Sequence, residues 1–281
     1  MTTGSKGAVR HRRTLFRWFA LGVIWMIVNL VLYQLFDRWK DFESAAGRSI
    51  TRAALQAYTG RQITVPSHGA DGPASRVLRY RLMEPREDSP DETFPVLLFL
   101  HGAGERGDNN RQQLQGLPAR MASRDWRERF PCFLIAPQCP RGESWTERLS
   151  DLQTLLGQVL QDPRADRDRV YVTGLSMGGF GTWALAARYP DLFAAAAPIC
   201  GGGDPTTAKR LVDLPIWAVH GAADDVVPVE RSREMVDAVQ VAGGDIRYTE
   251  LPGVSHDSWT AAYADLDGIV AWLFRQERSD D

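Results

Sequence analysis

Cysteine is scarce in this sequence, and its scarcity limits how the fold can be held together. Three cysteines among 281 residues are too few for a disulfide framework. Cys132, Cys139 and Cys200 lie at or near the ends of predicted strands, where we expect them to be small buried hydrophobic side chains. Cys132 and Cys139 cannot pair along one extended strand, because seven residues of strand span about 23 Å.

A net positive charge is found only at the N-terminal end of the chain. Five of the 33 basic side chains lie within residues 1–36, which hold none of the 35 acidic ones. The rest of the chain is therefore net acidic and lacks the basic footprint of a nucleic-acid-binding protein. Internal repeats are also absent, and no second domain separates from the pattern, although the length would allow two small domains.

Hydrophobic runs long enough to cross a bilayer are rare, and one covers residues 18–36, WFALGVIWMIVNLVLYQLF. Its nineteen residues are about the length that a membrane-spanning helix needs. Trp18, Tyr33 and Trp39 stand where interface aromatics are expected. Because the apolar residues run all the way round a helix, a buried soluble helix is the weaker alternative. We predict a transmembrane signal anchor.

Two other fates of this segment stay open. A cleaved signal peptide usually has an apolar stretch of about 7–15 residues with a small-residue cleavage site close behind it. Here the stretch is longer and is followed by DRWKDFE, so a retained anchor is favoured. An Arg-rich organelle transit peptide is the runner-up. With residues 1–17 as a basic arm that stays cytoplasmic, we expect a single-pass membrane protein whose remaining residues are extracytoplasmic.

The chain from residue 76 onward alternates short apolar runs with helical patterns. Strands are predicted at 76–84, 94–102, 130–137, 168–175, 193–200, 214–221 and 245–251, and helices at 110–123, 149–161, 177–189, 230–241 and 258–277. This alternation implies an α/β fold with a mainly parallel central sheet flanked by helices. Residues 37–75 are expected to be a linker and early strand region. No segment is long enough for a large lid.

The stretch VYVTGLSMGGFGTW, residues 170–183, places a serine between glycines where a strand ends and a helix begins. Gly174 to Gly178 fit the G-x-S-x-G pattern, in which a sharp turn strains the central residue and small neighbours avoid clashes. The turn would expose the Ser176 hydroxyl at the carboxyl end of the strand, where ligands collect in such sheets. We predict Ser176 as a nucleophile, with a plain glycine turn as the alternative.

A serine hydroxyl needs a base, and the base needs an orienting group. Of the five histidines, His256 is the best placed, in the loop between the last predicted strand and the last predicted helix. His101 and His220 also end strands, but structural histidines are the commoner case there. The stretch HGAADDVVP supplies two candidate acids, Asp224 and Asp225, which the residues alone do not separate. The order serine, aspartate, histidine matches one known type of triad.

The stretch FLHGAGERGDN is expected to supply an oxyanion hole, because its glycines let the backbone approach a substrate closely. The N–H groups of Ala103 and Met177 are the candidate donors. Glu105, Arg106 and Asp108 are expected to brace this loop through ion pairs, and Arg106 is also a candidate substrate-binding residue. Trp145 and Trp259 follow motif segments and are candidates for the walls of the site, with buried packing as the alternative.

Together, HGAGERGDN, APQCP, GLSMGGFGTW, HGAADDVVP and GVSHDSW resemble the α/β-hydrolase family, in its small lidless carboxylesterase branch. That branch is related to dienelactone hydrolases, phospholipase/carboxylesterases and prolyl-oligopeptidase-like peptidases. The resemblance covers about residues 76–276 and implies an α/β-hydrolase fold. It also implies Ser176 as nucleophile, His256 as general base and acid, and the first of the two aspartates, Asp224, as the orienting carboxylate.

The sequence therefore predicts a membrane-anchored serine hydrolase that cleaves carboxylic esters, either small or polymer-borne, with its catalytic domain at residues 76–281. No metal, organic cofactor or nucleic-acid partner is implied. A serine peptidase of prolyl-oligopeptidase-like type is one alternative, because it uses the same triad. A non-catalytic interaction module on the same fold is the other, and it is disfavoured because every triad position is filled.

Overall fold

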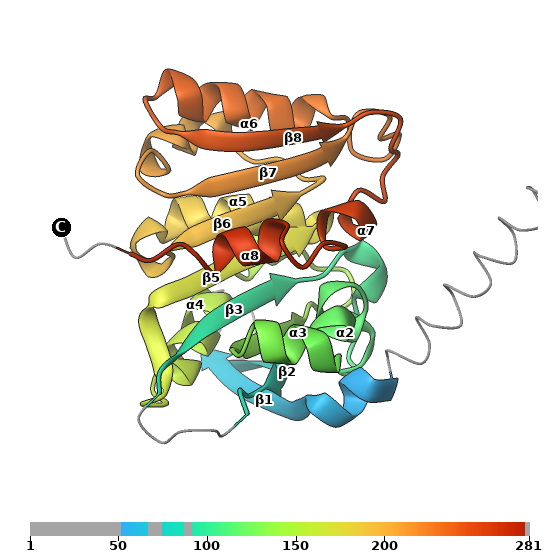
Figure 1. The fold of residues 1–281 in the computed structure, drawn as a ribbon, viewed down its shortest axis with the longest axis vertical. Coiled ribbons are helices and arrows are strands. Elements are labelled where there is room, and N and C mark those ends of the chain that lie inside the picture. The colour runs from blue at the N-terminus through green and yellow to red at the C-terminus, as the bar shows by residue number, and fades with distance from the viewer. Residues whose placement is uncertain (1–51, 67–74, 87–91, 279–281) are drawn as a thin grey trace, which may run out of the picture. The chain divides into compact units, whose positions relative to one another are not determined.

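The central element is an eight-stranded sheet in the order β1-β2-β4-β3-β5-β6-β7-β8 (Figure 1). The computed structural model describes residues 52–66, 75–86 and 92–278, all within one unit, Ile50–Asp281. The strands are β1 Thr59–Pro66, β2 Ser75–Met83, β3 Phe94–Leu100, β4 Phe133–Gln138, β5 Ala165–Leu175, β6 Ala195–Ile199, β7 Ile216–Gly221 and β8 Ile246–Leu251. Neighbours from β4 to β8 pair in parallel, whereas β2 is antiparallel to both β1 and β4.

Helices cover both faces of the sheet, as the predicted α/β class requires (Figure 1). They are α2 Leu117–Met121, α3 Arg124–Arg129, α4 Leu149–Val159, α5 Met177–Arg188, α6 Glu230–Val241, α7 Trp259–Ala262 and α8 Ile269–Leu273. Short 3-10 turns lie at η1 Ala103–Glu105, η2 Gln112–Leu114, η3 Trp145–Glu147, η4 Pro190–Leu192 and η5 Pro205–Arg210. Between β6 and β7 the chain forms only η5, so no inserted domain stands between those strands.

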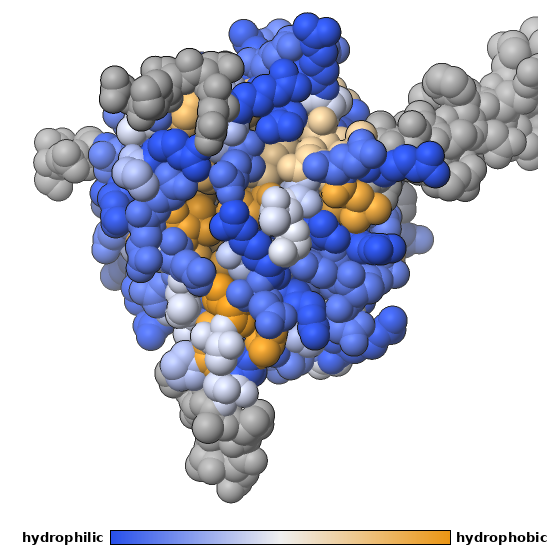
Figure 2. All heavy atoms as spheres, turned by 90° about the horizontal axis from the view of Figure 1, so that it is seen from below, coloured by the Kyte–Doolittle hydropathy of each residue, from blue (hydrophilic) through white to orange (hydrophobic). Residues whose placement is uncertain are grey.

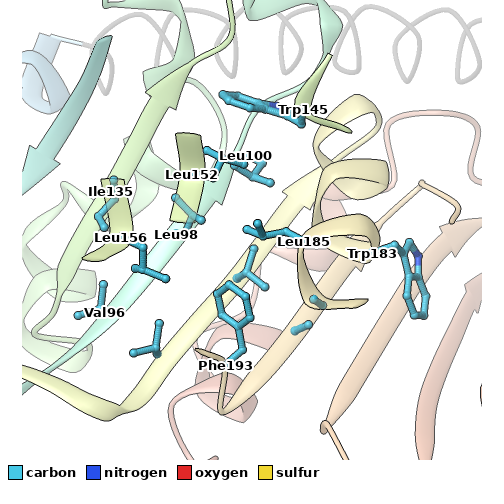
Figure 3. Packing of buried hydrophobic residues seen from close by; sticks show 14 of the residues in the cluster. Val96, Leu98, Leu100, Ile135, Trp145, Leu152, Leu156, Trp183, Leu185 and Phe193 are labelled. Carbon is cyan, nitrogen blue, oxygen red and sulfur yellow. The ribbon is translucent and has the colours of Figure 1, made fainter. Parts of the chain in front are cut away.

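The strands are buried on both faces because successive side chains point to opposite sides of the sheet. In β3, Leu98 and Leu100 pack on the α4 side of the sheet, and Figure 3 shows them beside Leu152 of that helix. Leu97 and Phe99 of the same strand belong to the second cluster, on the side of α2, α3 and α8. Alternate residues of such an apolar strand therefore pack into two hydrophobic clusters, one on each face of the sheet.

β1 is one of the two edge strands of the sheet, with β8 at the opposite edge, and it is largely polar. Its burial alternates only at its end, where Ile63 and Val65 point inward. Figure 2 views the molecule from this side and shows mainly hydrophilic residues, with hydrophobic ones between them. Polar and charged side chains on an edge strand discourage pairing with other chains. β1 lies within the predicted linker and early strand region and pairs along its whole length with β2.

Most predicted elements are confirmed, and two predicted helices are wrong. The helix predicted at 110–123 is broken into η2 and α2, because Gly116 adopts φ +69° between them and Pro118 stands in the first turn of α2. The helix predicted at 258–277 is likewise broken into α7 and α8. There the Gly268 N–H donates to the Asp265 carbonyl in a turn that ends the first helix and begins the second.

The predicted signal anchor at residues 18–36 and the basic arm at residues 1–17 lie outside the described residues. Within the part of the chain that the structure describes, none of the helices has the length and apolar character needed to span a bilayer.

Candidate active site

Ser176 sits at the turn from β5 into α5 in a backbone conformation that side-chain-bearing residues rarely adopt, with φ 52° and ψ −117°. Two hydrogen bonds hold it there: its N–H donates to the Ile199 carbonyl at 3.0 Å, and its carbonyl accepts from the Phe180 N–H at 3.0 Å. A strained conformation persists only where the surroundings determine it, and such positions cluster at functional sites. The Ser176 hydroxyl is therefore aimed by the fold.

Glycine is required on both sides of this turn. A Cβ at Gly178 would lie 1.9 Å from the Leu100 carbonyl oxygen, and one at Gly174 would lie 2.5 Å from the Gly178 carbonyl oxygen. Both contacts are with backbone atoms, which cannot move aside as a flexible side chain could. The close approach of β3 to the turn thus explains the two glycines of the G-x-S-x-G pattern.

His256 lies in the loop between β8 and α7 and connects the serine to an aspartate. Its Nε2 is 3.0 Å from Ser176 Oγ, and its Nδ1 is 2.8 Å from Asp224 Oδ2. Because a carboxylate only accepts, Nδ1 carries the proton and Nε2 is free to accept from the serine hydroxyl. The three side chains predicted as nucleophile, base and orienting acid thus form one chain of hydrogen bonds at the carboxyl ends of β5, β7 and β8.

The two aspartates that the sequence left unresolved have different surroundings. The Asp224 side chain is fully buried, and its Oδ1 accepts from the N–H groups of Val226 and Val227, both at 2.9 Å. Burial acts to raise the pKa of Asp224, but the hydrogen bonds from His256 and from these two N–H groups outweigh it and hold the pKa below its usual value. Asp225 is exposed and accepts from Ser255 Oγ at 3.0 Å.

His101 has a structural role. Its Nδ1 donates to the Gly102 carbonyl at 2.6 Å, and its Nε2 accepts from the Cys139 N–H at 3.0 Å. These partners fix a neutral ring, and burial lowers its pKa to about 4. The geometry therefore supports a structural role for His101 rather than a role as the catalytic base. Its ring links the end of β3 to the end of β4.

His220 contacts the candidate site, as its predicted position at the end of a strand allowed. Its ring is completely buried, with Nε2 3.2 Å from Asp224 Oδ2 and Nδ1 2.7 Å from Ser232 Oγ. The spacing of four residues between His220 and Asp224 was a second available signal. Ser232 lies on α6, and nothing in its sequence surroundings marked it.

The two candidate oxyanion donors occupy equivalent positions on neighbouring strands. Leu100 of β3 pairs with Gly174 of β5, and Ala103 and Met177 each follow three residues later. Ala103 begins η1 and Met177 begins α5, whose N-terminus carries partial positive charge. Among the described residues, no acceptor takes a hydrogen bond from the N–H of either one. Two N–H groups are thus available to a ligand beside Ser176.

The predicted brace of the loop after β3 is wrong. Among the described residues, no ion pair forms within that loop; the side chain of Gln138 holds it instead. Its Nε2 donates to the Glu105 carbonyl at 3.0 Å, and its Oε1 accepts from the Asn110 N–H at 2.6 Å. Arg106 is half-buried, and within the described chain its Nε has no hydrogen-bond partner.

Of the two tryptophans predicted to line the site, Trp145 does not line it. Trp145 is completely buried, and its Nε1 donates to the His101 carbonyl at 2.9 Å, so it belongs to the core (Figure 3). Trp259 is half-buried and stands beside the site, with its ring centroid 5.4 Å from that of His256 and the rings nearly perpendicular. Trp259 alone is therefore positioned to border a substrate.

The cysteines are free and buried, as predicted. Burial raises the pKa of Cys132 and Cys200 to about 12 and that of Cys139 to about 11, so none is a reactive thiolate. Cys200, Asp224 and His256 bring their sulfur, oxygen and nitrogen atoms within 4.8 Å of one another. Since Asp224 and His256 are already hydrogen-bonded to each other, we assign no metal to this group.

Residues 141–266 match the model of the dienelactone hydrolase family. A thermostable esterase of known crystal structure is 36% identical, with a TM-score of 0.74 over 80% of this chain and 64% of that chain. The chain thus has the α/β-hydrolase fold, and residues 141–266 are similar to the dienelactone hydrolase family. The matched segment contains Ser176, Asp224 and His256, whereas Ala103 and Arg106 lie before it.

Two curated proteins are similar over shorter parts of their length. A protein of Arthroderma benhamiae, named an uncharacterized secreted protein, is 31% identical over 64% of this chain and 24% of its own length. A bifunctional acetylxylan esterase/xylanase of Neocallimastix patriciarum is 29% identical over 47% of this chain and 20% of its own length. The match therefore spans about a quarter or less of the length of these two relatives.

Proposed function

We propose that this chain, which has the α/β-hydrolase fold and is similar to the dienelactone hydrolase family, is a serine hydrolase that cleaves carboxylic esters. The observation that carries the proposal is the unbroken line of hydrogen bonds from Ser176 through His256 to Asp224, with the serine held in a strained turn. A serine that merely ends a strand needs neither the strain nor a base aligned with it.

In the proposed acylation step, Ser176 Oγ attacks the acyl carbonyl carbon while its proton moves to His256 Nε2. The carbonyl π electrons move to the oxygen, giving a tetrahedral oxyanion. Collapse of this intermediate breaks the bond to the alcohol oxygen, and His256 Nε2 returns the proton to that oxygen. The short Ser176–His256 distance of 3.0 Å places both atoms in position for this transfer.

The oxyanion would be stabilised by the N–H groups of Ala103 and Met177. Their value lies in being fixed before the reaction, so that no reorganisation is needed when charge develops. The partial positive charge at the N-terminus of α5 acts in the same direction. Removing one donor of this kind typically lowers kcat about 10²- to 10³-fold.

Deacylation repeats the same steps with water in place of the alcohol. His256 takes a proton from the water, the hydroxide attacks the acyl carbon, and Ser176 Oγ leaves with the proton. Asp224 does not take that proton; it keeps the tautomer of His256 and stabilises the imidazolium. The depressed pKa of Asp224 suits this role, because it keeps the carboxylate ionised beside the His256 ring.

The substrate class we propose is an ester that is either small or borne on a polymer. The segment between β6 and β7 is too short for a lid domain, which favours an open site. The acetylxylan esterase relative is named for an ester carried on a polysaccharide. Trp259 and Arg106 are our candidates for contacts with the substrate, the former because it stands beside His256.

Turnover of a matched substrate panel tests the proposal. We expect hydrolysis of p-nitrophenyl esters of short acyl chains, with slower turnover as the chain lengthens, and no turnover of the corresponding p-nitroanilides. Preferential cleavage of anilides would instead identify a peptidase, which uses the same triad on an amide. Ser176→Ala is the control, and esterase activity that survives this substitution would contradict the assignment of the nucleophile.

We also propose that residues 18–36 are a single-pass anchor and that the catalytic domain is extracytoplasmic. The support is the length and uniform apolar character of the segment and the basic arm before it. Accessibility of single cysteines introduced on either side of the segment to a membrane-impermeant thiol reagent tests this topology. Labelling of the N-terminal side alone would contradict it.

A further inference from the structure

His220 lies next to the last residue of β7 and contacts the carboxylate that we propose as the orienting acid. Its ring is 0% exposed, and both ring nitrogens have close partners. Nε2 is 3.0 Å from the Val227 carbonyl oxygen and 3.2 Å from Asp224 Oδ2. Nδ1 is 2.7 Å from Ser232 Oγ on α6. No part of the proposed reaction requires a second histidine at this place.

The partners of Nε2 decide where its proton is. A carbonyl oxygen only accepts, so Nε2 carries a proton and donates it to the Val227 carbonyl, with Asp224 Oδ2 beside it at 3.2 Å. Ser232 has a single hydroxyl proton and two neighbours, His220 Nδ1 and the Gly201 carbonyl oxygen at 3.0 Å. If Ser232 donates to Nδ1, the His220 ring is neutral; if it donates to Gly201, the ring is cationic. In both cases the Nε2–H group lies beside Asp224.

Asp224 consequently has polar groups on both carboxylate oxygens. Its Oδ1 accepts from the N–H groups of Val226 and Val227, and its Oδ2 accepts from His256 Nδ1 and lies 3.2 Å from His220 Nε2. Without His220, the backbone N–H groups of Val226 and Val227 would fix Oδ1 of Asp224, and His256 would be the only contact of Oδ2 among these groups. His220 adds a second contact from a ring that cannot move, because it is packed and hydrogen-bonded on both sides.

We propose that His220, supported by Ser232, is a positioning residue that holds Asp224 against His256 and limits how strongly Asp224 attracts the His256 proton. The inference rests on the proposed function, because it assigns His220 a role through the orienting acid. The proposed hydrogen-bonded group of Ser176, His256 and Asp224 thereby gains two supporting residues. His220 lies at the end of β7, the strand that also leads to Asp224, and Ser232 lies on α6.

The other charged groups near His220 are already engaged. On β8, Glu250 is the register partner of His220, and its carboxylate is bound by Arg233 of α6 at 2.6 and 2.9 Å. Asp225, in the loop after β7, is exposed and bonded to Ser255. From the loop after β8, His256 reaches His220 only through Asp224. Asp224 is thus the carboxylate that His220 contacts directly.

Replacing His220 should change the pH dependence of kcat/KM, and the charges involved determine the direction of the change. Loss of the Nε2 donor leaves more negative charge on Asp224 Oδ2, which stabilises protonated His256. Because only neutral His256 can accept the serine proton, the acidic limb of the kcat/KM profile should move to higher pH. Damage to packing alone would lower the rate at every pH and leave the limb in place.

The test compares His220→Leu, His220→Gln and Ser232→Ala in the full chain. We expect His220→Leu to lower kcat about tenfold to hundredfold, the effect of losing a close polar contact with a charged group, with KM within about twofold. His220→Gln can place an amide N–H near the position of Nε2 and should recover most of the rate and the wild-type limb. Ser232→Ala should fall between these two variants.

A readout besides activity separates this inference from the proposed function. The midpoint at which the His256 ring signals titrate by NMR should be higher in His220→Leu than in wild type, whether or not the protein turns over any ester. His101→Leu is the matched control, because it removes another buried histidine that does not contact Asp224. An unmoved midpoint in folded His220→Leu, or a His220→Gln variant as impaired as His220→Leu, would overturn the role of His220. Failure of wild type to cleave esters would overturn the proposed function alone.

Discussion

At the scale of single residues, Asp224 and Asp225 have the same chemistry and different neighbours. Asp224 is enclosed and accepts hydrogen bonds from two backbone N–H groups and from His256, whereas Asp225 faces solvent. The residue types alone could not rank them, because the direction of each side chain is set by the turn after β7. The resemblance to a known family was needed to choose Asp224, and the contact at 2.8 Å agrees with that choice.

This pair gives a matched test of the orienting role. We predict that Asp224→Asn lowers kcat about 10³- to 10⁴-fold, because the amide favours the wrong His256 tautomer. Asp225→Asn removes the same charge one residue away and should change kcat less than about twofold. Steady-state kinetics on one p-nitrophenyl ester measures both, and equal losses in the two variants would contradict the assignment.

His101 makes a prediction about stability and pH. Burial and fixed partners keep its ring neutral and lower its pKa to about 4, whereas the unfolded chain takes up the proton near pH 6.5. The unfolded state therefore binds more protons between these values, so stability falls as the pH drops from about 6.5 to about 4. The expected loss is about 3 kcal/mol.

Urea unfolding at pH 7 and pH 4.5 measures this loss, with His101→Gln as the comparison. The variant cannot titrate at this position, so its free energy of unfolding should depend less steeply on pH than that of wild type. Identical pH dependence in the two proteins would show that His101 is not the group responsible.

At the scale of secondary-structure elements, the turn between β5 and α5 determines where the proposed nucleophile stands. The turn is packed against the end of β3 so closely that Gly178 has no room for a side-chain carbon, which would lie 1.9 Å from the Leu100 carbonyl oxygen. Gly157 of α4 is the opposite case, because nothing lies within 4 Å of its added carbon and its backbone is helical.

These two glycines predict stability changes of opposite sign. Gly178→Ala should lower the free energy of unfolding by at least about 2 kcal/mol, since backbone atoms of β3 must shift. Gly157→Ala should raise it by about 0.5–1 kcal/mol, because alanine loses less entropy in a helix interior. Thermal unfolding followed by circular dichroism compares them, and a neutral Gly178→Ala would contradict the packing described for the turn.

The elements also show which features a sequence can predict. The predicted bounds of α6 agree with the structure because its pattern is uninterrupted, and the buried strands were marked by continuous apolar runs. The pattern at 110–123 looked helical as well, but the left-handed conformation of Gly116 divides it. Such a conformation depends on tertiary packing, so the residue type alone did not reveal the break.

At the scale of the whole molecule, the site is assembled by the order of the strands. β5, β7 and β8 are far apart in sequence, yet their carboxyl ends lie on the same side of the parallel sheet (Figure 1). The loops that follow these three ends carry the serine, the aspartate and the histidine. The rule that ligands bind at the carboxyl ends of parallel strands predicted the location of the site. It could not predict the contact between His220 and Asp224, since that depends on how one loop folds back over a strand.

The wrong assignment of Trp145 has the same origin. Trp145 follows β4 and therefore lies near the carboxyl ends of the parallel strands, where the site is. Its side chain nevertheless turns inward and donates to the His101 carbonyl. Whether an aromatic side chain lines a site or fills the core depends on the space beneath it. Here the space is set by Gly181 of α5, whose missing side chain leaves room for the indole.

The measurement that tests the central proposal most directly is covalent labelling with a fluorophosphonate, a probe that reacts with activated serine hydroxyls. We predict that the folded wild-type protein is labelled once, that mass spectrometry places the label on Ser176, and that Ser176→Ala and His256→Ala are not labelled. A folded wild-type protein that is not labelled, or a label on another residue, would contradict the proposal.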